Sequence, residues 1–243
     1  MDARPERGGA AHAQASGDRP FSRSPALSDA GGQHAAAALL RRAGSAQPTE
    51  QRLLIAAALR EVMTRTPVVV GGAAEAYWAG DLYRPTDLDL CPRPTVADEA
   101  ALTALGFQKE GRHWVHADLV YGVEFPGSGD DIQRTVEVSV GGAHAVVIAV
   151  EDLYLDRLRQ STMTERTRDR HFQDAVAIIV ARRTALDWTY IDQRIEEEAA
   201  TGQPLVGVAM QRMHPRVRAA ARRALARIRR QELPEPRDPD HIA

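Results

Sequence analysis

Two aspartates in the segment PTDLDL have the residue types and spacing for metal chemistry. Asp87 and Asp89 are separated by one leucine and followed by another. Because successive side chains of a β-strand point to opposite faces, this alternation predicts a strand with both carboxylates on one face, roughly 7 Å apart. Like charges at this spacing repel each other unless a cation lies between them, and carboxylate oxygens are ligands that Mg²⁺ prefers. The pair therefore predicts a Mg²⁺ (or Mn²⁺) site.

A third carboxylate on a neighbouring strand would complete a site for chemistry at phosphorus. Glu124 in YGVEF alternates with apolar residues on a second β-rich run, and it is the acid that we favour. Glu137 in TVEVSV shows the same alternation on the next run, so the sequence leaves the choice between these two open. Three acids that hold one or two metal ions can orient a hydroxyl for in-line attack on a phosphoryl group.

A glycine pair lies about fifteen residues before the aspartates. Gly71 and Gly72 end the apolar, β-branched run PVVV, and a short helical pattern, AAEAYWA, follows them. The N–H groups at a helix N-terminus favour phosphate, and glycines allow a triphosphate close to the backbone. A D-x-D pair alone is more typical of a solvated strand edge, and a Gly-Gly pair alone of a tight turn. A glycine pair, then an aspartate pair, then a glutamate on a strand is an order that favours a site for phosphoryl transfer.

The run VVVGGAAEAYWAGDLYRPTDLDL resembles the signature of the nucleotidyltransferase superfamily that includes DNA polymerase β. Its bacterial abortive-infection and toxin–antitoxin members are the most similar subgroup. The resemblance covers roughly residues 50 to 200, and its motif positions correspond to Gly71, Gly72, Ala74, Arg84, Thr86, Asp87 and Asp89, with Glu124 as the third carboxylate. It implies an NTP substrate, Mg²⁺ (or Mn²⁺) as cofactor and transfer of a nucleoside monophosphate to a hydroxyl.

The same resemblance implies further roles. It assigns nucleotide binding to Gly71, Gly72, Arg84, Thr86 and Arg157, and catalysis to the three acids. The family commonly has lysine where this chain has Arg157, and Lys109 is the only lysine here, so an arginine fork would bind the phosphate. A salt bridge between Arg157 and Asp174 on the following helix is an equal alternative.

The acceptor of the nucleotide stays open in the sequence. In related toxins it is the 3′ end of a tRNA, and in other relatives a protein side chain or a small molecule. The alternatives to an active transferase are a catalytically idle nucleotide- or partner-binding module and an enzyme that transfers AMP to proteins. The presence of all three acids argues against the idle module, because an unused cluster of like charges destabilises a fold.

The C-terminal segment is rich in arginine. Between Gln211 and Leu233 the sequence contains Arg212, Arg216, Arg218, Arg222, Arg223, Arg227, Arg229 and Arg230. A helix with this charge would bind RNA phosphates by counterion release, or an acidic partner such as an antitoxin. A solvated helix that only covers its domain is the alternative. His113 and His116, three residues apart on a β-run, would face opposite ways, so we expect no metal site from that pair.

Composition limits the function classes. A net charge of −2 gives no overall argument for nucleic-acid binding, so any basic surface that binds nucleic acid must be local. The single Cys91 excludes an internal disulfide and a cysteine-based zinc cluster. No stretch approaches the ~18 apolar residues of a membrane span, and the N-terminus lacks a signal-peptide pattern, so we expect no membrane partner and a cytoplasmic location.

The order of elements predicts the fold class. Residues 1–48 have no sustained apolar period and are predicted to be a disordered tail. Residues 49–150 alternate helical and strand patterns, including a helix that Thr95 caps, and predict an α+β nucleotidyltransferase core with a small mixed sheet. Residues 151–231 predict a helical C-terminal domain, with helices near 151–160, 169–183, 187–199 and 208–231, and 232–243 a flexible tail.

Overall fold

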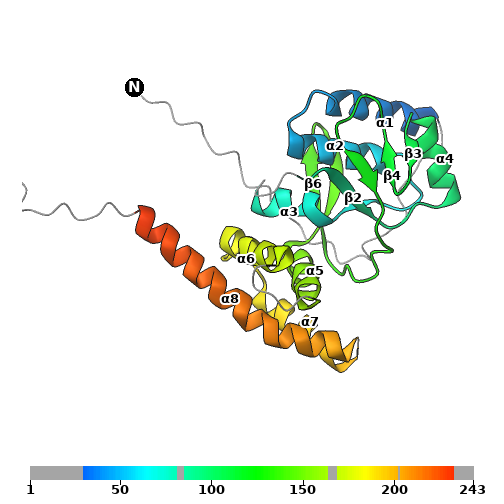
Figure 1. Cartoon of the computed structure of the whole chain (residues 1–243). Helices are drawn as coiled ribbons and strands as arrows, with labels where there is room; N and C mark the ends of the chain where they lie inside the picture. The colour runs from blue at the N-terminus through cyan, green and yellow to red at the C-terminus, as the bar shows by residue number, and fades with distance from the viewer. Residues whose placement is uncertain (1–29, 81–84, 164–168, 202, 233–243) are drawn as a thin grey trace, which may run out of the picture. The chain divides into compact units, whose positions relative to one another are not determined.

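The computed structural model describes residues 30–80, 85–163, 169–201 and 203–232 (Figure 1). The chain divides into two compact units. Unit 1 comprises the chain up to Ala74 and residues Tyr83–Ala149, and unit 2 comprises Glu75–Leu82 and the chain from Val150. Helices and a mixed sheet, followed by a helical C-terminal region, confirm the α+β class.

Unit 1 is built on one seven-stranded mixed sheet with the order β3-β4-β5-β2-β1-β7-β6. Its strands are β1 (Val68–Val69), β2 (Asp87–Cys91), β3 (Gln108–Glu110), β4 (His113–Val115), β5 (Gly122–Glu124), β6 (Thr135–Val140) and β7 (Ala143–Ile148). β2 pairs with β5 and β1 with β7 in parallel, whereas the other neighbouring strands are antiparallel. Alternating or wholly apolar β-rich runs in the sequence predicted every strand except β3, whose exposed QKE carries no apolar signal.

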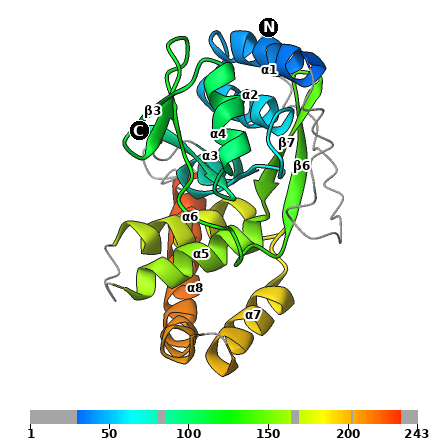
Figure 2. The ribbon, with the colours of Figure 1, turned by 90° about the vertical axis from the view of Figure 1, so that its right-hand side faces the viewer.

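Three helices of unit 1 are α1 (Ala30–Ala43), α2 (Pro48–Arg60) and α4 (Val96–Ala104). α2 packs on β1, β6 and β7, and α1 packs on α2 beside the β6–β7 hairpin (Figure 2). The Thr95 cap is confirmed: its side chain accepts from the Asp98 backbone N–H, and Asp98 caps Thr95 in return.

The prediction of disorder over residues 1–48 is wrong for α1. The run AAAALLRRA by itself predicts only a transient helix, but Ala36, Leu40 and Ala43 are fully or almost fully buried against α2, so tertiary packing makes this helix stable. The rest of the predicted tail, residues 1–29, lies outside the described residues, as do 233–243.

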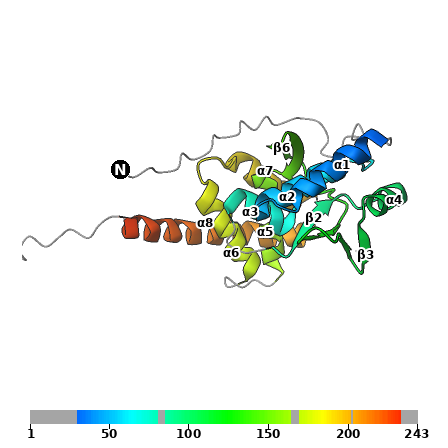
Figure 3. The same ribbon diagram turned by 90° about the horizontal axis from the view of Figure 1, so that it is seen from above.

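The helix α3 (Gly71–Ala79) starts in unit 1 and continues into unit 2, which also contains α5 (Val150–Thr162), α6 (Arg170–Arg182), α7 (Trp188–Ala200) and α8 (Pro204–Glu232). α8 continues through Pro215 and packs on α5, α6 and α7 (Figure 3). A side chain at Gly207 would collide with the backbone of Ala199, so glycine permits the close approach of α7 and α8. Among the described residues, no helix has both the length and the apolar character to cross a bilayer.

Candidate functional site

The sheet of unit 1 places the three predicted acids on two paired strands, and carboxylate oxygens of Asp87 and Glu124 lie within 4.8 Å of each other. β2 and β5 pair in parallel, with Asp87 opposite Gly122 and Asp89 opposite Glu124. Glu137 lies on β6 at the far edge of the sheet, where its carboxylate is 2.8 Å from Arg60 Nη1 and 3.4 Å from His144 Nδ1. The structure therefore places Glu124, and not Glu137, beside the aspartate pair.

The strand faces divide as the alternation predicts. Leu88, Leu90 and Val123 are completely buried beneath the sheet face that carries the acids. The Asp87 and Glu124 side chains keep 29% and 15% of their surface exposed, so a ligand can reach them from solvent. Thr86, predicted to bind nucleotide, is exposed and directly precedes β2. The prediction for Arg84 lies outside the described residues.

His113 is a member of this cluster that the sequence interpretation missed. β4 runs antiparallel to β5, with His113 opposite Glu124 and Trp114 opposite Val123. His113 Nε2 lies 3.4 Å from Glu124 Oε2 and 3.9 Å from Asp87 Oδ2. Donor atoms of Asp87, His113 and Glu124 all lie within 4.8 Å of one another, a spacing that a metal ion can bridge. The available signal was the buried Trp114, which turns His113 to the opposite face.

Arg112 supplies the positive charge that faces the cluster. Its Nε lies 3.3 Å from Glu124 Oε2 and donates to His113 Nε2 over 3.3 Å. The Arg112 side chain is 71% exposed and extends from the turn before β4, so it can leave the cluster without disturbing the sheet.

Gly71 connects the glycine turn to the acids. Its φ is +59°, a left-handed conformation that other residues rarely adopt. A Cβ at Gly71 would lie 2.9 Å from Cγ of Asp89, so a side chain here would push that carboxylate away. Gly71 and Gly72 are the first residues of α3, where an α-helix leaves backbone N–H groups without intrahelical partners. The turn thus presents N–H groups beside the Asp89 strand.

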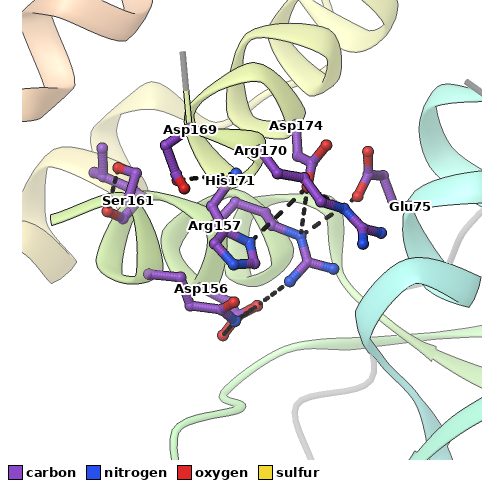
Figure 4. Close-up of polar contacts among 10 residues, drawn as sticks. Glu75, Asp156, Arg157, Ser161, Asp169, Arg170, His171 and Asp174 are labelled. Atoms are coloured by element: carbon purple, nitrogen blue, oxygen red, sulfur yellow. Dashed lines mark hydrogen bonds and ion pairs between the residues drawn. The ribbon is translucent and has the colours of Figure 1, made fainter. Parts of the chain in front are cut away.

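Arg157, a predicted phosphate ligand, lies in a second acidic cluster within unit 2 (Figure 4). Its Nε is 3.4 Å from Glu75 Oε2 and 3.8 Å from Asp174 Oδ2, and its Nη1 is 3.0 Å from Asp156 Oδ2. Arg157, Glu75 and Asp174 keep only 6%, 5% and 1% of their side-chain surface exposed. The interhelical salt bridge foreseen as the alternative is therefore present, and nucleotide binding by Arg157 stays a prediction.

Burial perturbs both acids of this second cluster. Desolvation raises the pKa of Glu75 to about 7, the negative charge of Asp174 adds to the rise, and Arg157 opposes it. Burial also raises the pKa of Asp174, while Arg157 and the hydrogen bond from Glu75 act in the opposite direction. Burial thus favours the neutral form of both carboxyl groups, and the guanidinium of Arg157 favours their charged form.

The arginine-rich helix α8 has two different surfaces. Val217 and Ala221 are completely buried, and the Arg218 guanidinium lies 4.6 Å from the centre of the Trp188 ring. Farther along, α8 and the end of α6 form an open hollow of about 490 Å³. The hollow is lined by Arg183, Arg222, Leu225, Ala226, Arg229 and Arg230. No acidic residue of the described chain lines this hollow.

Comparison with protein-family models, with curated proteins and with solved structures finds no match to this chain. The functional interpretation therefore depends on the geometry of the two units.

Proposed function

We propose that this chain is a metal-dependent nucleotidyltransferase whose active site lies in unit 1. The observation that carries the proposal is the convergence of Asp87, Asp89 and Glu124 on one face of two paired strands, next to the left-handed Gly71 turn. Acids that share a strand face favour a bound cation, and a glycine turn at a helix N-terminus suits a triphosphate. These are the two binding requirements of nucleotidyl transfer.

Each of these residues would have a role in the reaction. The acceptor hydroxyl oxygen forms a bond to the α-phosphorus of the NTP while the bond from that phosphorus to the bridging oxygen breaks. Diphosphate leaves, and the hydroxyl proton passes to a carboxylate or to water. Gly71 and Gly72 would bind the leaving phosphates through backbone N–H groups, and Glu124 would orient the acceptor hydroxyl.

The donor set of unit 1 fits a divalent cation. Oxygen atoms of Asp87 and Glu124 are within 4.8 Å of each other, and Asp89 lies beside Glu124 in the strand register. A bound divalent ion supplies charge neutralisation for the phosphates and lowers the pKa of an attached hydroxyl. Mg²⁺ and Mn²⁺ accept such oxygen ligands.

A labelled-nucleotide assay tests the proposal. The full chain is incubated with Mg²⁺ or Mn²⁺, each [α-³²P]NTP in turn, and total RNA or cell lysate. We expect label on a macromolecule with wild type and a loss of at least about 10²-fold with Glu124→Gln, because one electrostatic group at the reacting centre contributes this much. Glu137→Gln is the matched control and keeps full activity, since Glu137 lies at the other edge of the sheet.

The outcomes separate the candidate functions. Label on RNA supports transfer to a nucleic-acid hydroxyl, and label on protein supports the enzyme that transfers AMP to proteins. Nucleotide binding without label in any fraction, unchanged in Asp89→Asn, would favour the idle binding module and overturn the proposal.

The arginine hollow of unit 2 favours RNA as the acceptor class. Arg222, Arg229 and Arg230 are exposed on α8, and Arg183 faces the same hollow from the end of α6. Within the described residues, no carboxylate forms an ion pair with any of these four guanidinium groups, and their clustered positive charge favours an anionic ligand. Guanidinium forks match phosphate oxygens in bidentate geometry, and the small Ala226 between them leaves room for a sugar–phosphate backbone.

An acidic protein, such as an antitoxin, is the competing occupant of the hollow. Stable protein interfaces usually depend on large aromatic or aliphatic anchors in central pockets. The hollow offers only Leu225 and Ala226 among its apolar lining residues, and no aromatic ring. Its chemistry is therefore closer to a phosphate-binding surface than to a protein interface.

Charge-matched variants on the same helix distinguish these occupants. We expect Arg222→Gln/Arg229→Gln to weaken binding of a single-stranded RNA oligonucleotide at least about tenfold and to reduce the dependence of log Kd on log salt by about 1.4, since each lost contact to single-stranded phosphate contributes about 0.7. Arg212→Gln/Arg216→Gln removes the same charge outside the hollow and has a smaller effect. Equal losses in both pairs, or preference for polyglutamate over RNA, would contradict RNA binding in the hollow.

A further inference from the structure

His113 extends the proposed metal site from an oxygen-only set to a mixed one. Residues directly opposite each other in an antiparallel pair lie on the same face of a sheet. His113 is opposite Glu124, and Glu124 is next to Asp89 on the parallel neighbour β2. The imidazole therefore lies on the face that carries the acids, while its neighbour Trp114 is buried on the other face.

The distances suit shared coordination. His113 Nε2 is 3.4 Å from Glu124 Oε2 and 3.9 Å from Asp87 Oδ2. Two ligand atoms that bind the same ion at about 2.0–2.2 Å are separated by roughly 3–4.4 Å, depending on the coordination angle. Both separations fall in this interval, and the Asp87 and Glu124 oxygens are within 4.8 Å of each other, so side-chain adjustments alone can bring all three groups to one cation.

The position of Arg112 indicates where that cation would bind. Its Nε contacts Glu124 Oε2 and donates to His113 Nε2, both over 3.3 Å. The ring nitrogen accepts this hydrogen bond with its lone pair, and a metal ion would bind the same lone pair. The exposed guanidinium thus lies where a bound cation would lie. It can be displaced because 71% of its side chain is exposed to solvent.

We infer that His113 Nε2 is a metal ligand together with Asp87 and Glu124, and that the site selects cations that accept imidazole over Mg²⁺. Mg²⁺ is bound almost entirely by oxygen, whereas Mn²⁺, Co²⁺ and Zn²⁺ bind imidazole nitrogen with increasing strength. The inference deepens the proposed function, because it concerns the metal of the same site. Metal binding can nevertheless be measured without NTP or acceptor.

The inference is tested by titrating the full chain with Mn²⁺ and measuring the unbound ion by its electron paramagnetic resonance signal. We expect His113→Gln to weaken Mn²⁺ binding at least about tenfold, because lost support of a metal ligand already costs 10–100-fold. Competition by Mg²⁺ against Mn²⁺ should become more effective in the same variant. His144→Gln is the matched control: its ring nitrogen is also 3.4 Å from a glutamate oxygen, but on β7, four strands away from β4 in the sheet.

Two further measurements keep the test independent of folding and of catalysis. Pulsed resonance of Mn²⁺ bound to the wild-type chain should show coupling to a directly bound ¹⁴N, which needs no variant. Arg112→Gln should bind Mn²⁺ more tightly than wild type, because a competing positive charge is removed. Absence of the nitrogen coupling, or equal Mn²⁺ affinity in His113→Gln and wild type, overturns the inference. A chain that shows the coupling but transfers no nucleotide would overturn the proposed function alone.

Discussion

The two units each contain a cluster of carboxylates next to an arginine, and the clusters differ in solvation. In unit 1 the Asp87 and Glu124 side chains are 29% and 15% exposed, and their arginine, Arg112, is largely in solvent. In unit 2 Glu75 and Asp174 are nearly inaccessible, and Arg157 between them is as deeply buried. The same residue types thus form an open cluster in one unit and a closed one in the other.

This difference in solvation indicates which cluster suits ligand binding and which stabilises the fold. A buried carboxylate needs a permanent internal partner, because the loss of hydration is large and must be compensated within the fold. A half-exposed carboxylate keeps part of its hydration and can exchange a mobile partner for a ligand. Unit 1 therefore has the properties of a ligand site, and the Arg157 cluster has those of an internal ion-pair network. Four substitutions test this comparison, from the largest expected effect to the smallest.

Asp87→Asn should abolish transfer while leaving the fold intact. We expect activity to fall by at least about 10³-fold, because the substitution removes a proposed metal ligand close to the charge that develops in the transition state. The free energy of unfolding of unit 1 should stay within about 0.5 kcal/mol of wild type, as for other substitutions outside the core. Labelled-NTP transfer and hydrogen exchange of the β2 amides measure the two quantities. A loss of stability as large as the loss of activity would mean that the unit 1 cluster is structural.

Arg157→Met should show the opposite behaviour and destabilise unit 2. Removal of one partner from a buried ion pair costs about 3–5 kcal/mol, because the remaining charges stay buried without compensation. Hydrogen exchange of the α5 and α6 amides measures the loss. Arg170→Met is the matched control: its Nε is 3.7 Å from the same Asp174 oxygen, but 58% of its side chain is exposed, so we expect less than about 1 kcal/mol. Equal losses in the two variants would contradict the role given to burial.

Glu75→Gln should change the dependence of unit 2 stability on pH. The folded-state pKa of Glu75, about 7, lies above its ordinary value of 4.5, so the folded state binds the proton more tightly than the unfolded state. The resulting stabilisation is complete below the ordinary value and is lost as pH rises through 7, up to about 3 kcal/mol at 1.36 kcal/mol per unit. We expect wild-type unit 2 to be less stable at pH 8 than at pH 5, and the variant to lose most of this difference. If hydrogen exchange shows the same dependence of unit 2 stability on pH in the variant and in wild type, the raised pKa of Glu75 is refuted.

Gly71→Ala should destabilise unit 1 modestly and clearly reduce activity. A left-handed non-glycine residue costs roughly 1–2 kcal/mol, and the new Cβ would also displace the Asp89 carboxylate. Gly142→Ala is the control, because Gly142 is also left-handed, with a φ of +80°, but has open space around its Cβ position. We expect similar thermal destabilisation in both variants and reduced transfer only in Gly71→Ala. Loss of transfer in both would separate Gly71 from the acid site.

Local sequence patterns predicted much of the fold. The alternation of DLDLC gave β2 with its buried leucines and accessible aspartates, and Thr95 gave the start of α4. The four C-terminal helices differ from their predicted bounds by at most a few residues, because a strong apolar period and capping aspartates such as Asp169 and Asp187 mark them. The patterns missed β3, whose residues are exposed and have no apolar period, and they gave α1 only as a transient helix, because its alanine-rich face becomes stable only by packing on α2.

What the sequence determined by itself is which side of each strand a residue faces, because that depends only on the period of two. It could not determine which strands are neighbours, because pairing depends on contacts between distant segments. Glu124 and Glu137 have the same alternation, and only the strand order puts Glu124 next to Asp89 and Glu137 at the far edge. The pairing of β4 with β5 likewise brings His113 to the acids, although nothing in the β4 sequence alone indicates that it has such partners.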